Sequence, residues 1–382
     1  MRDNTFAELF AGIGLVRLAL EEAGWDCVFA NDIDPKKAEI YAHNFGTQEL
    51  LVRDVREVSA GDIPGSPGLV TGSFPCIDVS LAGNRAGLNG THSGLFWELA
   101  RILGELGAER RQPSFVLLEN VTGLLTSNGG ADLYAIIEAL GCLGYRCDLV
   151  TLDASHFVPQ SRARLFVIAA HEMLRESPMR PPQDLLETIT PELRPRAVRD
   201  FIESNRDLAW GRVDIPRPPT RERKLKDVLE DLPDSSPWWW PAERVDAMLA
   251  TMSQRHRETV ERHRSSGKEL VATVFRRTRA GRAMAEVRAD GIAGCLRVAR
   301  GGSSKQILLL VRRSRVRARL LTPRECARLQ GVPDDFVINV PRNQALSGFG
   351  DAVCVPAVSW IARSAFPTAR PTRAGVPQLA AS

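Results

Sequence analysis

The stretch Thr5-Phe-Ala-Glu-Leu-Phe-Ala-Gly-Ile-Gly-Leu15 decides the fold, because it places a glycine-containing loop directly after a short apolar run. The run predicts a strand over 5–10, and the periodic apolar residues after it predict a helix over 15–23. A second predicted strand, over 27–30, closes on Asn31-Asp-Ile-Asp34. This order is typical of a βαβ unit that binds a nucleotide-like ligand. The third glycine of the dinucleotide fingerprint is missing, which disfavours NAD.

Strand and helix patterns keep alternating beyond this unit. Strands are predicted over 50–52, 69–71, 115–118, 146–152 and 164–170, and helices over 95–106 and 131–143. The alternation indicates an α/β protein with a doubly wound, mostly parallel sheet. Such sheets bind ligands at the carboxyl ends of their strands. We therefore expect Asp32 to accept hydrogen bonds from ribose hydroxyls and Asp54 to meet the base of the same ligand.

One cysteine stands just past the predicted strand over 69–71, in Gly72-Ser-Phe-Pro-Cys-Ile-Asp-Val-Ser80. Pro75 fixes its own φ and biases the residue before it toward an extended conformation, so the turn that carries Cys76 is comparatively rigid. A thiol there is well placed to act as a nucleophile. The alternative is a buried structural cysteine. Glu119, at the end of the apolar strand over 115–118, faces the same crevice.

Composition bounds the class of protein. The 382 residues are enough for two domains, and 44% hydrophobic with 25% charged residues is ordinary for a soluble protein. The sequence shows no cationic-then-apolar leader and no apolar run of about 18 residues, so we expect a cytoplasmic protein without a membrane span. The seven cysteines are scattered without zinc-ligand spacing, which favours a reducing compartment and no structural metal.

Positive charge is concentrated in one segment. Residues 251–320 hold eighteen Lys and Arg against five Asp and Glu, which suggests a polyanion as partner, with a solvated charged face as the alternative. A proline-rich connector over 177–241 precedes it. Trp238-Trp-Trp240 is interpreted as packing, with aromatic contact to a nucleic acid as the alternative. A helix is predicted over 243–263, and short strands over 270–320.

The end of the chain regains regular patterns. Thr322-Pro-Arg-Glu325 has the signature of a capping box, so a helix is predicted over 323–329. A last helix is predicted over 356–365, and the tail over 367–382 is expected to be disordered.

These segments, in this order, resemble the cytosine-5 DNA methyltransferase family. The stretch from Phe10 to Leu15 resembles its methionine-binding loop, and Gly72-Ser-Phe-Pro-Cys76 its nucleophile loop. Glu119-Asn-Val121 is similar to the catalytic acid motif and Gln160-Ser-Arg-Ala-Arg164 to the paired-arginine motif. The blocks Leu321–Gly331 and Gly350–Val353 look like those that support the recognition domain and complete the cofactor site.

The resemblance implies a role for each matching residue. The implied catalytic residues are Cys76, Glu119, Arg162 and Arg164, with Arg164 nearest the base. The alternatives are a helix cap or salt-bridge partner for Glu119 and structural ion pairing for Arg162. The implied S-adenosylmethionine contacts are Phe10, Gly12, Gly14, Leu15, Asp32, Ile33, Asp54, Val55, Pro75, Leu95, Asp351 and Ala352. The predicted DNA contacts are Ser80, Arg276, Arg277, Arg279, Arg297, Arg300, Gly302 and Ser303.

Two positions depart from the family's pattern. Ile77 stands where Gln is common, and Asp351 where Asn is commoner, and neither change removes a reacting group. The predicted domains are a catalytic domain over 1–175, a basic target recognition domain over 176–320, and a return segment over 321–366 before the tail.

The expected function is methyl transfer from S-adenosylmethionine to carbon 5 of cytosine in a specific double-stranded DNA sequence. The setting would be restriction–modification or phage defence, with a cognate endonuclease or defence proteins as partners, no membrane, and a monomeric enzyme. Three alternatives are a tRNA-methylating relative, an inactive DNA-binding relative, and a nicotinamide oxidoreductase. The basic segment disfavours the first, the intact Cys76, Glu119 and arginines disfavour the second, and the lack of any other hydride-transfer feature disfavours the third.

Overall fold

The computed structural model describes residues 4–74, 93–174, 177–180, 191–279, 281–298 and 305–366. By its internal contacts the chain forms two compact units. The first unit holds residues 1–153, 163–218 and 355–382, and the second holds 154–162 and 219–354. The predicted domain borders at 175, 320 and 366 follow sequence motifs and composition, whereas these units follow contacts. The borders therefore stay predictions.

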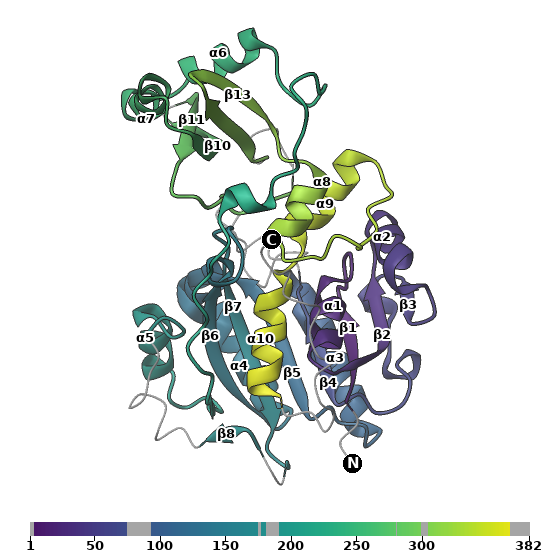
Figure 1. The fold of residues 1–382 in the computed structure, drawn as a ribbon. Coiled ribbons are helices and arrows are strands. Elements are labelled where there is room, and N and C mark those ends of the chain that lie inside the picture. The colour runs from purple at the N-terminus through teal and green to yellow at the C-terminus, as the bar shows by residue number, and fades with distance from the viewer. Residues whose placement is uncertain are drawn as a thin grey trace. The chain divides into compact units, whose positions relative to one another are not determined.

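A seven-stranded sheet forms the centre of the first unit, in the order β3-β2-β1-β4-β5-β7-β6 (Figure 1). Its strands are β1 Thr5–Leu9, β2 Asp26–Asp32, β3 Leu50–Val52, β4 Leu69–Gly72, β5 Phe115–Val121, β6 Tyr145–Asp153 and β7 Ala163–His171. Strand β7 runs antiparallel to both of its neighbours, and the other pairs are parallel. The predicted α/β fold with a mostly parallel sheet is confirmed.

Helices cover both faces of this sheet. Helices α3 Phe96–Ala108 and α4 Ala131–Cys142 contribute Leu99 and Ile136 to one large core with β5 residues such as Val116. On the opposite face, Trp25 makes edge-to-face contacts with Phe115 of β5 and with Phe366, at centroid distances of 6.3 and 6.4 Å. Helices α1 Leu15–Glu22, α2 Pro35–Phe45 and α10 Val355–Ala365 belong to the same unit. Both faces are therefore buried, as parallel sheets require.

Helix ends follow local chemistry. Helix α8, Pro323–Leu329, begins at the predicted residue, because Thr322 accepts a hydrogen bond from the Glu325 backbone and the Glu325 carboxylate accepts one from the Thr322 backbone. Helix α2 was not predicted, although Asp34 caps it by accepting a 2.9 Å bond from the Lys36 backbone. The single helix predicted over 243–263 is wrong. The structure has two, α6 Ala242–Ala250 and α7 Gln254–Ser266.

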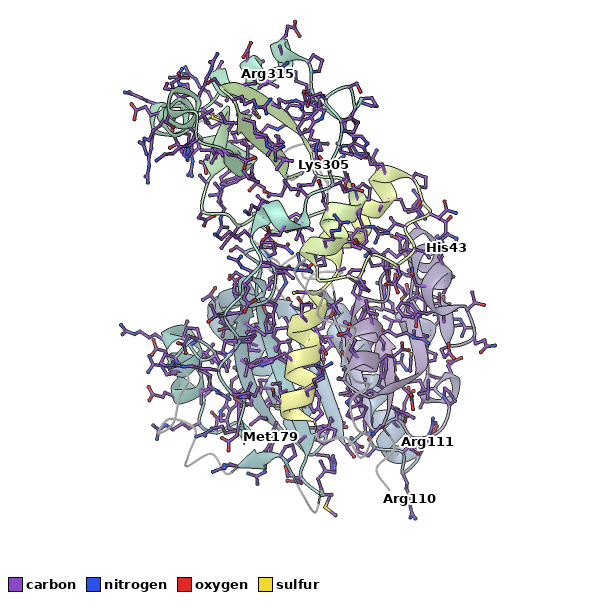
Figure 2. All side chains as sticks on the ribbon, viewed as in Figure 1. His43, Arg110, Arg111, Met179, Lys305 and Arg315 are labelled. Carbon is purple, nitrogen blue, oxygen red and sulfur yellow. The ribbon has the colours of Figure 1, made fainter. Side chains whose placement is uncertain are left out.

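The second unit contains a four-stranded antiparallel sheet in the order β11-β10-β12-β13. Its strands are β10 Leu270–Arg279, β11 Arg282–Arg288, β12 Ile307–Arg312 and β13 Arg315–Leu320. One face packs on α6 and α7 through Val245 and Val260. Figure 2 shows Lys305, just before β12, and Arg315, at the start of β13, near opposite ends of this sheet. The remaining described elements of both units are β8 Met179–Arg180, α5 Arg196–Ser204, β9 Arg212–Val213 and α9 Arg342–Asp351.

Within the described part of the chain, one apolar helical stretch, Arg342–Ala365, is long enough to cross a membrane. The chain leaves helical conformation between α9 and α10, so the stretch is two shorter helices. In its most apolar window 67% is buried inside the protein, which is the burial of core helices.

Candidate active site

The approach to the nucleophile loop is tightly packed. A Cβ on Gly72, at the end of β4, would lie 2.5 Å from a methyl carbon of Leu99, so a larger residue there would force the buried Leu99 side chain to move. Phe74 is buried and its ring centroid lies 5.7 Å from that of Phe96. The predicted residues Pro75, Cys76 and Ser80 lie outside the described residues. The structure describes the residues just before Pro75, and Gly72 and Phe74 are tightly packed there.

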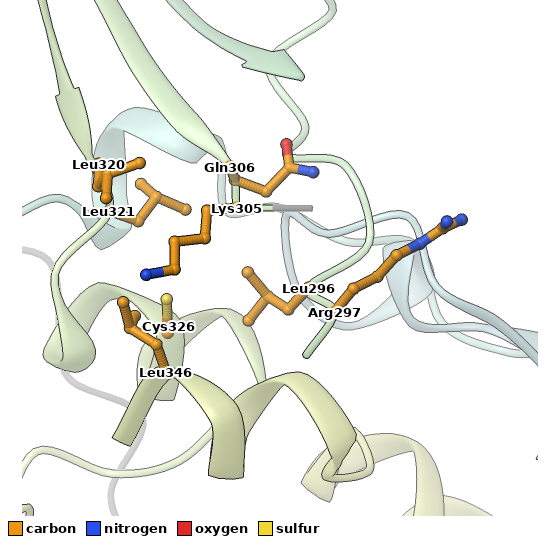
Figure 3. A pocket seen from close by; sticks show the side chains of 8 residues that line it. All are labelled: Leu296, Arg297, Lys305, Gln306, Leu320, Leu321, Cys326 and Leu346. Atoms are coloured by element: carbon orange, nitrogen blue, oxygen red, sulfur yellow. The ribbon is translucent and has the colours of Figure 1, made fainter. Parts of the chain in front are cut away.

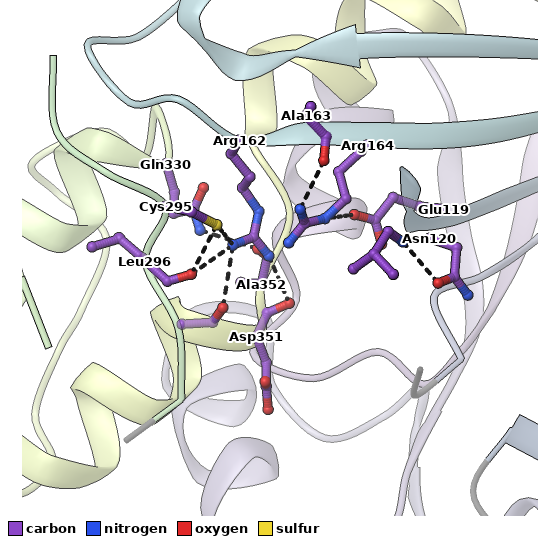
Figure 4. A network of polar contacts seen from close by, with 12 residues as sticks. Glu119, Asn120, Arg162, Ala163, Arg164, Cys295, Leu296, Gln330, Asp351 and Ala352 are labelled. Atoms are coloured by element: carbon purple, nitrogen blue, oxygen red, sulfur yellow. Dashed lines mark hydrogen bonds and ion pairs between the residues drawn. The ribbon is translucent and has the colours of Figure 1, made fainter. Parts of the chain in front are cut away.

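The carboxylate of Glu119 lies at the end of β5, beside β4. Its Oε1 atom is 2.7 Å from Nε of Arg164, and the two side chains are only 11% and 16% exposed (Figure 4). Strand β7 places Arg164 opposite Val121 and so next to Glu119 on the antiparallel ladder. Since β4 and β5 are parallel neighbours, Glu119 and the exit toward Cys76 lie at the same edge of the sheet.

Asn120 is a site residue that the motif contained without an assigned role. It is buried, and its Nδ2 donates to the carbonyl oxygen of Phe74 at 3.5 Å while its Oδ1 accepts from the backbone of Val121. The side chain thus ties the strand that carries Glu119 to the last described residue before Pro75. A polar residue directly after a fully apolar strand was the signal that could have identified it.

Arg162 has different neighbours from Arg164, although only one residue separates them. It belongs to the second unit, is 3% exposed, and donates to the carbonyl oxygens of Leu296, Gly350 and Asp351 at 2.9, 3.3 and 3.3 Å. A guanidinium that holds three carbonyls fixes backbone segments. A catalytic role for Arg162 stays a prediction, and these contacts favour a structural one.

Gln160 strengthens the same junction within the second unit. Its fully buried side chain donates to the Leu329 carbonyl at 2.7 Å and accepts from the Leu296 backbone at 2.9 Å. Gln330 in turn donates to the carbonyls of Phe349 and Ala352. The segment 154–162 is thereby integrated with the residues around 296, 330 and 350, a connection that sequence spacing does not reveal.

The glycine loop after β1 is held in an unusual conformation. Phe10 has a φ of 60°, which is a strained value for a residue with a side chain and is often found at functional sites. Gly14 has a φ of 84°, and a Cβ there would lie 2.5 Å from the Phe45 ring. At Gly12, by contrast, an added Cβ would meet no atom of the described residues within 4 Å, so the backbone is open there. This is a cradle that a ligand can approach closely.

Asp32 closes this cradle from the end of β2. Its carboxylate accepts from the backbone N–H of Gly12 at 2.7 Å and of Asp34 at 2.8 Å. Burial raises the pKa of Asp32, while those two hydrogen bonds act to lower it. The carboxylate is therefore anchored next to the glycine loop, with lone pairs left for a further donor.

The remaining predicted cofactor contacts in the first unit include one exposed apolar side chain. Ile33 is 62% exposed, which is unusual for isoleucine beside a glycine loop, and Val55 is buried. Asp54 accepts from the backbone of Arg56 at 3.0 Å. An open glycine cradle, an anchored carboxylate and an exposed apolar side chain fit a nucleoside bearing an amino-acid chain, as in S-adenosylmethionine. Leu15 begins α1, and Leu95 is partly buried against the main core.

Other predicted contacts lie in the second unit. Asp351 ends α9, and its carbonyl and that of Ala352 accept the bonds from Arg162 and Gln330. Arg276, Arg277 and Arg279 lie exposed on β10, while Arg300, Gly302 and Ser303 fall outside the described residues.

A small pocket in the second unit has no features of a reaction site. Its walls are Leu296, Arg297, Lys305, Gln306, Leu320, Leu321, Cys326 and Leu346, and Figure 3 shows the predicted DNA contact Arg297 extending away from Cys326. Burial raises the pKa of the Cys326 thiol far above its usual range, so it stays protonated and is not a nucleophile. In the parts of the chain that the structure describes, three or more potential metal ligands do not gather anywhere.

Known proteins resemble the chain over almost its whole length. A family model described as C-5 cytosine-specific DNA methylase matches residues 4–366. The type II methyltransferase M.DsaV of Dactylococcopsis salina is 30% identical, over 94% of this chain and 84% of the relative. The type II methyltransferase M.HpaII of Haemophilus parainfluenzae is 28% identical, over 93% and 87%.

Solved structures share the fold. The Dnmt2 methyltransferase of S. pombe has a TM-score of 0.60 at 18% identity, covering 94% of this chain and 96% of its own. The Entamoeba histolytica methyltransferase EhMeth has a TM-score of 0.64 at 15% identity, covering 95% and 97%. With the match over residues 4–366, the chain belongs to the C-5 cytosine-specific DNA methylase family, whose members transfer a methyl group from S-adenosylmethionine to carbon 5 of cytosine.

Proposed function

We propose that this chain methylates cytosine within one specific double-stranded DNA sequence, with Cys76 as the nucleophile and Glu119 and Arg164 at the base. The observation that carries the proposal is the 2.7 Å pair between Arg164 and Glu119 at the edge where β4 leads toward Cys76. That pair holds a carboxyl group at the same end of the sheet as the last described residues before Cys76.

Cytosine carbon 5 is a weak nucleophile until the aromatic ring is broken. The Cys76 thiolate adds to carbon 6, and the displaced ring electrons move toward nitrogen 3. Glu119, as an acid or hydrogen-bond donor, stabilises the charge that develops on nitrogen 3. Of the Arg164 donors, Nε faces Glu119 and Nη1 donates to the Ala163 carbonyl at 2.9 Å, so Nη2 is left for the cytosine carbonyl oxygen.

S-adenosylmethionine, when bound, supplies an electrophilic methyl group on its sulfonium sulfur. Asp32 would accept the ribose hydroxyls, and the loop from Phe10 to Gly14 would hold the amino-acid end, with Ile33 and Asp54 at the adenine. Methyl transfer from the cofactor to carbon 5 would release S-adenosylhomocysteine. The carbon 5 proton then passes to solvent water, and its electron pair restores the ring as Cys76 departs as thiolate.

A base inside a duplex cannot reach a thiol on a loop, so the target cytosine must be flipped out of the stack. Arginines of the second unit would hold the duplex during this step, and binding would weaken as salt increases.

The test is sequencing of methylated cytosines in DNA from a methylation-free host that expresses the chain, with Cys76→Ala as the matched variant. We expect methylation within one short motif for the wild type and none for the variant, whose fold and cofactor affinity stay intact. A folded, cofactor-binding wild type that leaves DNA unmethylated would contradict the proposal, and methylation of tRNA would then identify the RNA substrate instead.

The setting we propose is restriction–modification, in the cytoplasm and as a monomer. The support is that both M.DsaV and M.HpaII are named type II methyltransferases. DNA from the expressing host should resist a cognate endonuclease that cuts the same motif. Light scattering should give a mass close to the 42.1 kDa of one chain. A stable dimer in solution would contradict the monomer. Cleavage of the host DNA at the methylated motif by the cognate endonuclease would contradict the restriction–modification setting.

A further inference from the structure

Strands β10 and β11 continue past the rest of their sheet. Strand β10 pairs with β12 only from Leu270 to Val274, whereas its pairing with β11 runs on to Arg279 opposite Arg282. Beyond Val274, β10 and β11 pair only with each other as strands, and the other edge of β11 is bridged at Ala285 by Met252, so the end of this two-stranded ribbon, 277–279 with 282–284, has no third strand among the described residues. The ribbon is about 5 Å from strand to strand. A two-stranded ribbon of this kind fits the DNA major groove, which is about 12 Å wide.

One face of the ribbon carries a compact polar group. Glu286 lies opposite Phe275, and the register places Arg277 and Arg279 on the same face. Oε1 of Glu286 accepts from Nε of Arg279 at 2.9 Å and lies 2.8 Å from its Nη2. Oε2 lies 3.7 Å from Nε of Arg277, whose guanidinium is 4.8 Å from the Phe275 ring centroid. We call Arg277, Arg279 and Glu286 the ribbon triad.

Exposure differs sharply within the ribbon triad. The Glu286 side chain is 16% exposed, while those of Arg277 and Arg279 are 56% and 60% exposed. The shielded carboxylate of Glu286 therefore contacts both arginines on their less exposed side. The triad of two positive charges and one negative charge keeps a net charge of about +1. Because Glu286 occupies the Nε side of Arg279, the outer N–H groups of Nη1 and Nη2 face outward as a fork.

Two other arginines of this sheet, both on β13, are held by internal contacts. Arg319 is buried and paired with Glu325 at 2.6 Å. Arg317 is bonded to Asp234 and its guanidinium lies 3.9 Å from the Trp239 ring centroid. The ribbon triad differs from them because its guanidinium ends stay open to a partner.

We propose that the ribbon triad reads a guanine in the target sequence through the major groove, with Arg279 as the reading residue and Glu286 as its positioning residue. The inference rests on the proposed action on duplex DNA. An arginine fork matches the O6 and N7 acceptors of guanine and discriminates against the other bases. A phosphate contact would need charge but no fixed orientation, whereas Glu286 fixes the orientation of the fork before binding.

The experiment maps methylated motifs for wild type, Arg279→Lys and Glu286→Gln in a methylation-free host, together with cognate DNA binding at several salt concentrations. Arg255→Lys on α7 is the matched control, because Arg255 is exposed and carries no ion pair with the residues that the structure describes. Lysine keeps the charge of Arg279 and loses the fork. We expect Arg279→Lys to accept other bases at one guanine position, with roughly ten- to hundred-fold poorer discrimination there. Glu286→Gln should relax the same position less.

The outcomes separate base reading from its alternatives. An unchanged motif for Arg279→Lys, or uniformly weaker binding to all sequences with a shallower salt dependence in a companion Arg279→Gln variant, would make Arg279 a phosphate contact and overturn the inference. The inference would also be overturned if Arg279→Lys and Glu286→Gln relaxed base specificity at two different positions of the motif. Loss of methylation by wild type itself would instead contradict the proposed function. Cofactor binding by each variant shows that it is folded.

Discussion

The two sheets of this protein place charge in opposite ways. At the edge of the seven-stranded sheet, Glu119, Arg164 and Asp32 are largely buried, each with short, specific partners. On the four-stranded sheet, Arg277 and Arg279 are more than half exposed and share one acid. Buried, partnered groups are set for one reaction geometry, whereas exposed ones are available to a partner that varies. The groups we propose for the reaction and those we propose for base reading therefore belong to separate sheets.

The largest expected effect comes from breaking the buried pair. Glu119→Gln keeps the shape of the side chain and removes the acid, so kcat should fall by roughly 10²–10⁴. Affinity for S-adenosylmethionine should not change, because Asp32 and the glycine loop are untouched. Single-turnover methylation and calorimetric cofactor binding measure the two quantities.

Glu98→Gln on α3, which only loses a partly exposed pair with Arg101, is the control and should retain full activity. The catalytic role of Glu119 would be contradicted if both variants lost kcat equally, or if Glu119→Gln kept a normal kcat. The contrast between the two sheets would then fail.

A smaller effect is expected for Arg162, to which we assign no contact with the base. Arg162→Lys keeps the charge but cannot bond three carbonyls at once, so the free energy of unfolding should drop by about 1–3 kcal/mol. Urea unfolding measures it, with the exposed Arg196→Lys as control.

At a temperature where the folded fraction is unaffected, kcat of Arg162→Lys at saturating DNA should stay within a few-fold of wild type. A fall in kcat as large as that of Glu119→Gln, without loss of stability, would instead give Arg162 a catalytic role.

The smallest expected effect is a change in pH dependence. Glu8 of β1 is fully buried, neither carboxyl oxygen has a hydrogen-bond partner among the described residues, and this burial raises its pKa well above the usual value, with Arg17 opposing. Between the unfolded and the folded pKa, the native state keeps a proton that the unfolded state has lost. The free energy of unfolding therefore decreases as pH rises through that range, by at most about 1.4 kcal/mol per pH unit.

Glu8→Gln removes this contribution and should flatten the curve above pH 5 in urea titrations. A residual slope of the same sign is expected, because burial also raises the pKa of Asp32. Identical slopes for variant and wild type would mean that Glu8 is ionised in the folded protein.

Sequence reasoning succeeded where the determining interactions are local. The start of α8 is set by Thr322, Pro323 and Glu325 within one turn, and the predicted residue is correct. The parallel sheet follows from apolar runs that repeat along the chain. The missed α2 shows the limit, since its cap at Asp34 was present but its weak apolar face gave no clear periodicity.

Contacts between distant segments could not be predicted in the same way. Arg162 and Arg164 share one motif, yet the chain passes from one compact unit to the other between them, and only one of them meets Glu119. Glu286 carried no sequence signal, because its neighbours depend on the register of β10 against β11. The assignments of Cys76 and the cofactor contacts stay predictions.

The division of the chain into units has a consequence for synthesis and for engineering. The first unit is assembled from three separate pieces of chain, and its last piece contains α10 and Phe366, which packs on Trp25. On the ribosome, the part of this sheet's face that α10 and Phe366 cover stays open until those residues, more than 230 positions after β5, have been made, which lengthens its exposure to aggregation. For module exchange, residues 219–354 form a continuous cassette, but 154–162 must be exchanged with them, because Gln160 and Arg162 belong to the same unit.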